Sequence, residues 1–391
     1  MNDRSAPKKR LALFLDGTWN TVESATNVSK LHDNVAARGG GIEQLAYYDP
    51  GVGTGRFQWL RGGALGYGLS DNVVQAYHWL KDHYQNGDEI YIFGFSRGAY
   101  TARSLAGLIA KCGLLRSTAA IDAETLFARY QRSAEMRPIY TLAYEADHGG
   151  RLTDEEAALL EASRRVPIMM IAVWDTVGSL GIPFGNIPGL SRRRFRFHHT
   201  RLSNLFAHAY HALAIDEHRA PFAPSLWTRF SPKVPTPPSP GPQSTPIVEQ
   251  RWFIGAHADV GGGNPTHLPS APMHWIAQKA EQAGLAFDPL PPIGASDYLA
   301  PITDSYHGFM FGIYRRLKAR FYRTIGASRV EKRKGFVDTV NETIDASVFR
   351  RLREDPGYRP QALANWAQRR GVVLDRCEGD CDAATGNPLT R

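Results

Sequence analysis

Three residue types that together can perform nucleophilic acyl transfer stand at the ends of three separate apolar runs. Ser96 follows EIYIFGF, Asp175 ends VPIMMIAVWD, and His257 ends QRWFIGAH. A serine hydroxyl is too weakly acidic to attack an ester unaided, so it needs an imidazole to accept its proton. The imidazole needs a buried carboxylate, which selects its tautomer and stabilises the cation that forms. We therefore expect Ser96 as nucleophile, His257 as base and Asp175 as its carboxylate.

Each of these residues has a simpler interpretation when taken alone. Ser96 could cap a helix after a glycine-rich turn, Asp175 could stabilise a turn, and His257 could donate to a carbonyl group in the core. Asp259, two residues after His257, is a rival for the carboxylate role or stabilises the turn DVGGG. The joint occurrence of all three, together with the surroundings of Ser96, favours the catalytic interpretation.

The surroundings of Ser96 form the pattern GFSRG between a strand-like and a helix-like segment. A strand that turns sharply into a helix holds a serine at the apex in a strained backbone conformation, with its oxygen exposed above the sheet. Gly94 and Gly98 would leave room for the crossing backbone because they carry no Cβ atom. This context predicts a nucleophile at Ser96.

A tetrahedral oxyanion requires two backbone N–H groups that point at the developing charge. Arg97, the residue after the nucleophile, is expected to supply one of them. The other should come from the loop LDGTWN, through Gly17 or Thr18. Asp16 accepts hydrogen bonds only, so we expect it to organise this loop rather than to bind the oxyanion.

The elements that must position these residues alternate between buried strands and amphipathic helices. Strands are expected at 11–15 and 89–95 and before Asp175 and His257, and helices at about 70–85, from a Ser70 or Asp71 cap, and 97–111. Such alternation predicts a mostly parallel sheet with helices on both faces. The chain order Ser, Asp, His is that of the α/β-hydrolase fold. We therefore predict an α/β-hydrolase-like domain.

We expect one such domain over residues 10–375, between a flexible N-terminus (1–9) and a loose C-terminal tail (376–391). A long insertion, 178–250, separates the acid and histidine strands. It contains the apparently helical segment LSNLFAHAYHALAIDEHR and a proline-rich loop, 231–246, which should be extended or irregular. We interpret this insertion as a lid.

Composition bounds the class of protein. The net charge of +8 is spread over 46 basic and 38 acidic residues, so it favours acidic partners only weakly, and we expect no nucleic-acid partner. The three cysteines do not form a disulfide framework. His208 and His211 suggest a metal, but their apolar neighbours favour packing roles, and we expect neither metal nor cofactor. Neither a signal peptide nor a membrane span is evident, which predicts a protein made in the cytoplasm.

Five segments, FLDGTWN, GFSRGAYTAR, VWDTVGSLG, AIDEHR and GAHADVGGG, occur in this order. They resemble an α/β-hydrolase family, formerly a domain of unknown function, that includes the first class of bacterial type VI secretion lipase effectors. The resemblance implies a serine esterase or phospholipase A with Ser96, Asp175 and His257 in the catalytic positions. It also implies export to the periplasm of a target cell, with a secretion-machine or immunity protein as partner. Family members often carry a later histidine where this chain has Asp345; we favour His257 because it ends a core strand.

A phospholipase must extract its substrate from a membrane, so it needs cationic and apolar surface beside its site. The segment SRRRFRFHHTR offers both, and a peripheral membrane contact is expected through Arg192, Arg193, Arg194, Phe195, Arg196 and Phe197. RNA binding or a solvated basic loop are the alternatives for this segment. For the whole protein, a non-catalytic binding function and an esterase acting on non-lipid substrates are the alternatives.

Overall fold

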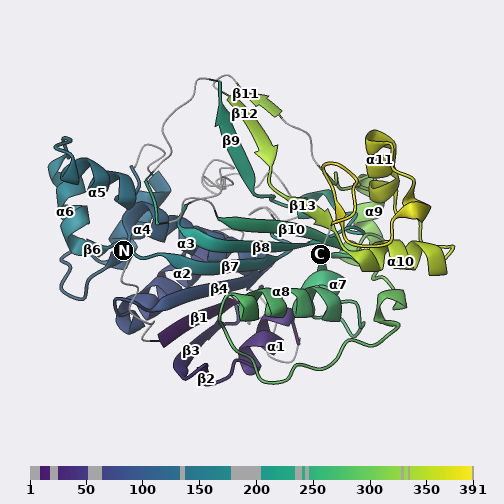
Figure 1. Ribbon diagram of the computed structural model, residues 1–391, viewed down its shortest axis with the longest axis horizontal. Coiled ribbons are helices and arrows are strands. Elements are labelled where there is room, and N and C mark those ends of the chain that lie inside the picture. The colour runs from purple at the N-terminus through teal and green to yellow at the C-terminus, as the bar shows by residue number, and fades with distance from the viewer. Residues whose placement is uncertain are drawn as a thin grey trace.

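A large sheet forms the centre of the protein (Figure 1). The computed structural model describes residues 9–17, 25–51, 64–132, 137–177, 204–233, 240–242, 246–326, 330–332 and 335–389. Within these residues the sheet has nine strands, in the order β14 (Cys381–Asp382), β13 (Glu342–Ile344), β10 (Ile247–Phe253), β8 (Phe206–Ala214), β7 (Ile168–Trp174), β4 (Glu89–Phe95), β1 (Lys9–Leu15), β3 (Ile42–Asp49) and β2 (Arg38–Gly39). The strands from β13 to β3 run parallel, and only the edge strands β14 and β2 pair antiparallel.

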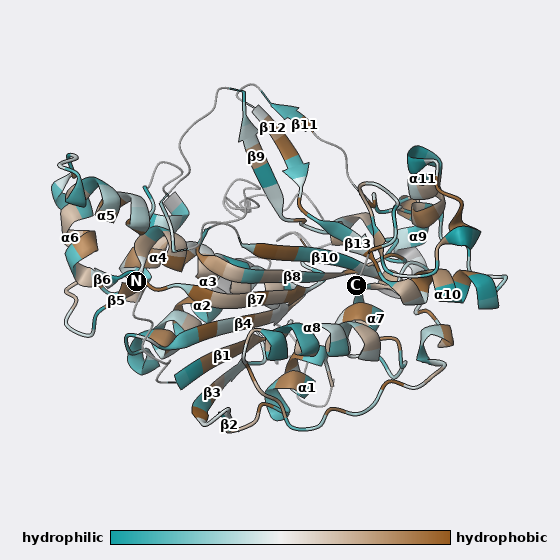
Figure 2. Ribbon diagram, in the orientation of Figure 1, coloured by the Kyte–Doolittle hydropathy of each residue, from teal (hydrophilic) through white to brown (hydrophobic). Residues whose placement is uncertain are grey.

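The inner strands are largely apolar, and brown segments mark apolar residues on several of them in Figure 2. Successive side chains on a strand point to opposite faces. Leu11 and Leu13 of β1 accordingly pack in one core cluster, whereas Ala12 and Phe14 pack in another. Burial on both faces is typical of parallel sheets covered by helices. The predicted α/β-hydrolase-like, mostly parallel sheet with helices on both faces is confirmed.

Helices form the two covering layers. One face packs against α2 (Ala64–His83), α3 (Arg97–Cys112), α4 (Ala123–Arg132), α5 (Ile139–Asp147) and α6 (Asp154–Ala162), with the short strands β5 (Leu114–Leu115) and β6 (Ser163–Arg164). The other face packs against α1 (Asn27–Asp33), α7 (His257–Gly261) and α8 (Ser270–Gln282). A third apolar cluster joins α10 (Ala346–Glu354) and α11 (Gln361–Arg370) to the β13–β14 end of the sheet.

A smaller antiparallel sheet stands apart from the main sheet, at the top of Figure 1. It consists of β9 (Thr228–Pro232), β12 (Gly335–Thr339) and β11 (Val330–Lys332). The start of the predicted proline-rich loop, Ser231 and Pro232, belongs to β9. The remaining short elements are η3 (Ala220–Phe222), η4 (Asp297–Leu299), η5 (Phe309–Gly312), α9 (Ile313–Leu317) and η6 (Leu374–Arg376).

The segment 206–214, for which we predicted a helix, is the central strand β8. It pairs with β7 on one side and β10 on the other, and residues 209–214 are buried throughout. Alanine, leucine and histidine favour a helix in isolation, but a segment enclosed by two strands and two helical layers takes the conformation of its neighbours. The interpretation of 178–250 as an insertion and lid is therefore wrong for 206–214 and for the start of β10. Residues 178–203 lie outside the described residues.

The predicted loose tail at 376–391 is also wrong for the residues that the structure describes there, 376–389. β14 pairs with β13, and the side chains of Cys377, Cys381 and Ala383 pack into the third apolar cluster. The Trp366 indole donates to the carbonyl of Ala383 (2.8 Å). A few apolar side chains spaced along a polar segment suffice for docking, and such a pattern has no period that a sequence reveals.

The N-terminal end of α2 differs from the expectation as well. The helix begins at Ala64, so Ser70 and Asp71 lie inside it rather than at its cap. The expected stop is close to the observed one, since α2 ends at His83, shortly before Asn86 and Gly87. Serine and aspartate are tolerated inside a helix when other parts of the helix are held by packing.

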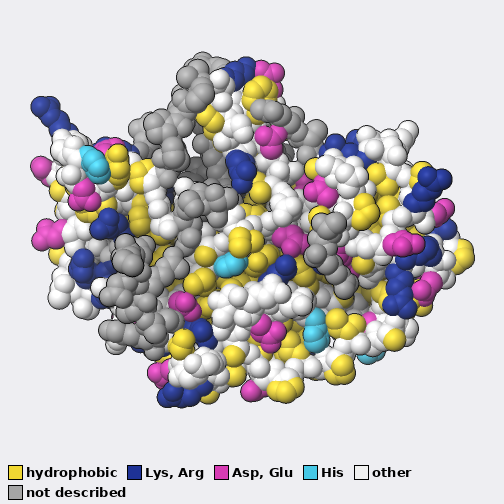
Figure 3. Space-filling model, in the orientation of Figure 1, with side chains coloured by type: hydrophobic (Ala, Val, Ile, Leu, Met, Phe, Trp, Pro, Cys, Tyr) yellow, Lys and Arg dark blue, Asp and Glu magenta, His cyan; other side chains and the backbone are white. Residues whose placement is uncertain are grey.

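The surface in Figure 3 mixes charges of both signs. Lys and Arg side chains gather over the α10–α11 end of the molecule, with acidic side chains among them. No helix in the described part of the chain has both the length and the apolar character required to cross a bilayer.

Candidate active site

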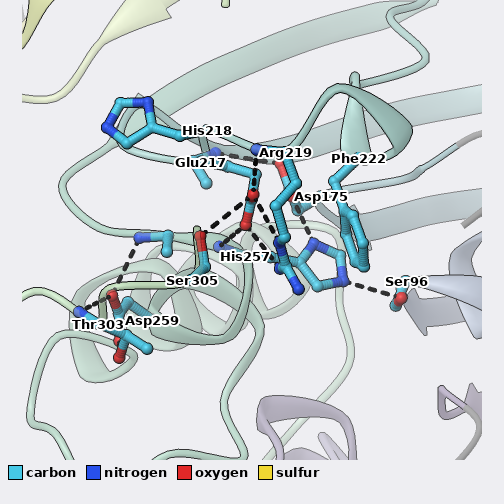
Figure 4. A network of polar contacts seen from close by, with 12 residues as sticks. Ser96, Asp175, Glu217, His218, Arg219, Phe222, His257, Asp259, Thr303 and Ser305 are labelled. Carbon is cyan, nitrogen blue, oxygen red and sulfur yellow. Dashed lines mark hydrogen bonds and ion pairs between the residues drawn. The ribbon is translucent and has the colours of Figure 1, made fainter. Parts of the chain in front are cut away.

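Ser96, His257 and Asp175 meet at the carboxyl edge of the main sheet (Figure 4). The Ser96 Oγ lies 2.8 Å from His257 Nε2, and the Asp175 Oδ2 lies 2.5 Å from His257 Nδ1. Ser96 directly follows β4 and Asp175 directly follows β7. β10 ends at Phe253, however, so His257 begins α7 rather than ending a strand as we expected. The intervening loop turns the imidazole back across β8 toward Ser96.

The backbone at Ser96 has the sharp turn that the GFSRG pattern predicts. Ser96 has φ of 56° and ψ of −116°, a region that residues with a side chain seldom adopt. A Cβ atom on Gly94 would lie 2.6 Å from the carbonyl oxygen of Gly98. A Cβ atom on Gly98 would lie 1.9 Å from the carbonyl oxygen of Leu15 at the end of β1. Both positions therefore exclude any side chain, because strand, helix and neighbouring loop cross there in contact.

The Asp175 carboxylate is fully buried and accepts bonds at both oxygens. Oδ1 accepts from Arg323 Nη1 (2.5 Å) and from the Ala214 N–H (3.1 Å), while Oδ2 faces His257 Nδ1 and accepts from Arg323 Nη2 (2.9 Å). Burial would raise the pKa of Asp175, but the Arg323 charge and the hydrogen bonds from His257 and Arg323 outweigh it and hold that pKa well below its usual range. Asp175 is therefore ionised at neutral pH. An ionised carboxylate at Nδ1 requires a proton on Nδ1, which leaves Nε2 to accept from Ser96.

Asp259, the alternative carboxylate, holds the loop instead of touching the imidazole. Its Oδ2 accepts from the N–H groups of Ala256 and Thr303 (2.9 Å each), and its Oδ1 accepts from the Thr303 hydroxyl (2.6 Å). The contacts tie the turn before α7 to the chain after α8. The role of a loop stabiliser is the one that these contacts support.

Another buried carboxylate, Glu217, lies next to His257 (Figure 4). It accepts hydrogen bonds from the backbone N–H of His257 (3.3 Å) and from the Ser305 hydroxyl (3.2 Å). Its two carboxylate oxygens also accept from the guanidinium of Arg219 (2.8 and 2.7 Å). Burial would raise the pKa of Glu217, but the bonds from Arg219 outweigh it and keep the pKa below its usual range. The Arg219 guanidinium also stacks on Phe222, whose ring lies edge-on to His257 at 5.1 Å.

The loop after β1 passes the elbow, as expected, but one predicted donor is engaged elsewhere. The Gly17 N–H donates to the Asp16 carboxylate (2.7 Å), so in this structure Gly17 is not aimed at an oxyanion. Asp16 also accepts from the hydroxyls of Tyr48 (3.0 Å) and Thr26, which fits its predicted role of organising the loop. Thr18, the other predicted donor, lies outside the described residues. Arg97 begins α3, where backbone N–H groups point out of the helix end.

His208 and His211 lie on β8, not on a helix, so their side chains leave the strand on opposite faces. The His211 Nε2 accepts from the Thr176 N–H (3.0 Å), and its ring packs edge-on against Trp227. Burial, with the nearby Arg103 charge, lowers the pKa of His211 to about 3, so the ring is neutral. His211 thus buttresses the residue that follows Asp175. Among the described residues, no group of three or more His, Cys, Asp or Glu side chains is arranged to hold a metal ion.

Asp345, the position at which the family resemblance led us to expect a histidine in relatives, caps a helix. Its carboxylate accepts from the Ser347 N–H (3.0 Å) at the start of α10 and pairs with Arg251 (3.3 Å). The predicted lipid-facing residues Arg192, Arg193, Arg194, Phe195, Arg196 and Phe197 lie outside the described residues.

Sequence reasoning missed two residues of this site. Glu217 had a signal, because it lies in AIDEHR, one of the five segments that carry the family resemblance. Arg323 had none, because it is one of several arginines in the basic segment GIYRRLKARFYR. Only the folded chain brings it to Asp175.

A family model and a curated relative match this chain. Residues 9–279 match the family model for the catalytic domain of Tle1-like phospholipase effectors of the type VI secretion system. The chain is 27% identical over 321 residues to the uncharacterized protein YEL023C of Saccharomyces cerevisiae, which covers 72% of this chain and 44% of that relative. The chain thus spans less than half the length of this curated relative.

Two solved structures are also similar. One is an uncharacterized protein from Pseudomonas aeruginosa, with 18% identity, a TM-score of 0.43, and coverage of 73% of this chain and 47% of that chain. The other is the Tle1 effector bound to the VgrG spike of the type VI secretion system, with 16% identity, a TM-score of 0.33, and coverage of 67% and 52%. Because the family model matches well over half of the sequence, the protein belongs to the family of Tle1-like phospholipase effectors of the type VI secretion system.

Proposed function

We propose that the protein is a serine carboxylester hydrolase of the phospholipase A type, with Ser96, His257 and Asp175 as its catalytic triad. The observation that carries the proposal is the unbroken line of contacts from Ser96 Oγ through the imidazole to Asp175, 2.8 and 2.5 Å long, at a strained strand-to-helix turn. Membership of the family supports a phospholipase or lipase type of activity.

The proposed reaction follows from the hydrogen-bond directions. The Ser96 hydroxyl donates to Nε2, so its proton passes to the imidazole as Oγ attacks the ester carbonyl carbon. Asp175 stabilises the imidazolium that forms. Collapse of the tetrahedral intermediate breaks the bond to the alcohol, which takes the proton from Nε2. A water molecule, deprotonated by the same nitrogen, then attacks the acyl carbonyl carbon. The bond from this carbon to Ser96 Oγ breaks, Oγ takes the proton back from Nε2, and the acyl group leaves as a fatty acid.

The oxyanion would be held by backbone donors at the start of α3 and in the loop after β1. Arg97 supplies the first in this proposal. Because Asp16 occupies the Gly17 N–H, Thr18 is the remaining predicted donor from the loop.

The test compares the wild type with Ser96→Ala on vesicles of phosphatidylethanolamine and phosphatidylglycerol. We expect the wild type to release free fatty acid and lysophospholipid, measured by mass spectrometry, and the variant to lose turnover by about 10⁶-fold. A fluorophosphonate probe should label the wild type on Ser96 only.

The products and the labelling distinguish the alternatives. Activity that survives in Ser96→Ala within about tenfold would place the nucleophile elsewhere. Release of a phosphorylated headgroup would rule out the A type. Hydrolysis of soluble esters without attack on vesicles would indicate an esterase for non-lipid substrates, and absence of both labelling and hydrolysis would indicate a binding protein.

Delivery by a type VI secretion machine, to the periplasm of a target cell and against an immunity partner, is part of the proposal. The family supports it. Loss of the protein from the medium of a strain with an inactivated secretion machine, at unchanged cellular amounts, is the expected result.

A further inference from the structure

Arg323 is the one charged residue besides His257 that contacts the Asp175 carboxylate among the described residues. Its guanidinium is completely buried and grips both carboxylate oxygens, Nη1 on Oδ1 and Nη2 on Oδ2. The same two nitrogens donate to the carbonyls of Ala214 (2.8 Å), at the end of β8, and Phe222 (2.6 Å), in η3. The guanidinium therefore joins the carboxylate to two neighbouring segments of the site.

We propose that Arg323 is a positioning residue for the reaction, which orients the Asp175 carboxylate toward His257. The inference rests on the proposed triad and goes beyond it, because a triad requires no cation on its carboxylate. It also places part of the catalytic unit beyond residue 279, where the match to the family's catalytic domain ends.

The orienting effect follows from the geometry. A guanidinium is planar and rigid, and its paired N–H groups fix the plane of a carboxylate that binds two of them. Oδ2 thereby stays in line with Nδ1 of His257 even though Asp175 itself has a strained backbone, with φ of 39°. A lysine has a single ammonium group and cannot hold both oxygens in one plane.

The electrostatic effect has a definite sign. A cation beside Asp175 offsets the negative charge that would otherwise stabilise the imidazolium, so removing it should move the acid limb of kcat/KM to higher pH. The other charged groups near His257 form a balanced pair, Glu217 with Arg219, and Asp259 is bonded to Thr303 and to the backbone. His211, on the neighbouring strand β8, is neutral because burial lowers its pKa to about 3. Arg323 is thus the residue whose removal would leave the negative charge of Asp175 without an opposing cation.

Other contacts from the same C-terminal part support the role of this region. The Tyr358 hydroxyl donates to Asp216 (3.1 Å), and Asp216 accepts from the Gly255 N–H (2.8 Å), two residues before His257. Thr303 holds Asp259 in the same way from the other side of that turn. The loop that carries His257 is therefore held by residues after 279, as Asp175 is.

The experiment compares Arg323→Gln, Arg323→Lys, Asp175→Asn and the double variant Asp175→Asn with Arg323→Gln. The matched control is Arg351→Gln, since Arg351 is also a buried arginine after residue 279 that binds one carboxylate (Asp355, 3.2 Å) and two carbonyls (Tyr298 and Ala300). We measure kcat and kcat/KM against pH on a short soluble ester, thermal unfolding and, without substrate, the NMR signal of the His257 Nδ1 proton, which reports its hydrogen bond to Asp175.

For Arg323→Gln we expect kcat to fall by about 100-fold and the acid limb of kcat/KM to move up by about one pH unit. The NMR signal of the His257 Nδ1 proton should move or broaden, because the carboxylate is no longer held in line with Nδ1. Arg323→Lys should keep the acid limb near that of the wild type and recover part of kcat. In the double variant, Arg323→Gln should slow the enzyme by less than about threefold relative to Asp175→Asn alone, because it acts through Asp175. Arg351→Gln should lower the unfolding temperature without moving the acid limb.

The proposal is overturned if Arg323→Gln keeps the kcat, the acid limb and the Nδ1 proton signal of the wild type. It is also overturned if Arg323→Gln matches Arg351→Gln, with lower stability and no pH effect. Should Arg323→Gln fail to fold, Arg323→Lys and the double variant, which leaves no unpaired buried charge, decide the question through the same measurements. A wild type that neither hydrolyses esters nor reacts with the fluorophosphonate would refute the proposed function instead, and the Nδ1 proton signal would still test the effect of Arg323 on the contact between Asp175 and His257.

Discussion

The surroundings of Ser96 and the surroundings of His257 and Asp175 are built in different ways. Ser96 owes its position to the backbone of consecutive residues, in which Gly94 and Gly98 allow a strand, a helix and the end of β1 to cross in contact. His257 and Asp175 owe theirs to side chains from distant parts of the chain, Arg323 and Thr303 above all. One half of the site is thus local in sequence, and the other is assembled by the fold.

The difference has an energetic reason. The elbow stores strain, but its glycines carry no side chain that needs a polar partner, so local sequence suffices to specify it. Asp175 and Glu217 are buried charges, and a buried charge that loses its partner destabilises a protein by about 3–5 kcal/mol. Partners for such groups must arrive from whichever segments the fold places beside them.

The largest effect is expected from breaking the local half. Gly98→Ala would put a Cβ atom 1.9 Å from the Leu15 carbonyl oxygen, where only backbone can move aside. We expect a loss of at least about 3 kcal/mol in the free energy of unfolding, together with loss of activity, measured by urea denaturation and ester hydrolysis. Gly379→Ala is the control, because a Cβ atom there meets no atom within 4 Å. Near-wild-type stability of Gly98→Ala would show that the elbow is not closely packed.

The next largest effect is expected in the half of the site that is assembled from distant side chains. It is tested by comparing two carboxylates, Asp259 and Asp345. Asp259→Asn replaces an acceptor by an amide group that cannot satisfy the N–H groups of Ala256 and Thr303 together with the Thr303 hydroxyl. We expect kcat to fall by about 10- to 100-fold as the His257 loop shifts. Asp345→Asn is the control, since asparagine caps helices as well as aspartate does. Equal activity of the two variants would contradict the role assigned to Asp259.

A smaller effect concerns stability and its dependence on pH. Burial lowers the pKa of His211 to about 3, while an unfolded histidine titrates near 6.5. As pH falls below about 6.5 the unfolded chain takes up a proton that the native ring refuses, so native stability falls, by about 2 kcal/mol at pH 5. We expect His211→Gln to remove this loss, measured as the free energy of unfolding at pH 7.5 and pH 5. The exposed His148, changed to Gln, should leave the pH dependence as it is; an unchanged slope in His211→Gln would mean that the buried ring takes up the proton.

The smallest effect is expected from the basic segment at residues 192–196, which lies outside the described residues. Replacing Arg192, Arg193, Arg194 and Arg196 by serine should lower activity on anionic vesicles severalfold and flatten its salt dependence. Each arginine near an anionic surface contributes about 1 kcal/mol at most to attraction. Hydrolysis of a short soluble ester should change little, because the triad is untouched. Equal losses on both substrates would show that these arginines support the fold or the pocket.

Much of the fold was predictable because its signals are short in range. The apolar runs that became β1, β4 and β7 are buried on both faces, and a continuous apolar run reports this directly. The elbow around Ser96 is encoded within five residues. Ser96, Asp175 and His257 could be related to one fold because each of them comes after an expected strand, in the same chain order. Because of these features, the sheet and the three principal residues of the candidate site could be predicted from the sequence.

The tertiary structure alone decided the features that depend on neighbours. It made a strand of 206–214, because β7 and β10 enclose it, and it docked 376–389 through Cys381 and Ala383 on the third core. It paired His257 with Asp175 and gave Asp259 to Thr303, although the two carboxylates were open alternatives in the sequence. It brought Arg323 to Asp175 from 148 residues away. A buried carboxylate demands a partner, but the sequence does not name it, because distance along the chain says nothing about distance in the fold.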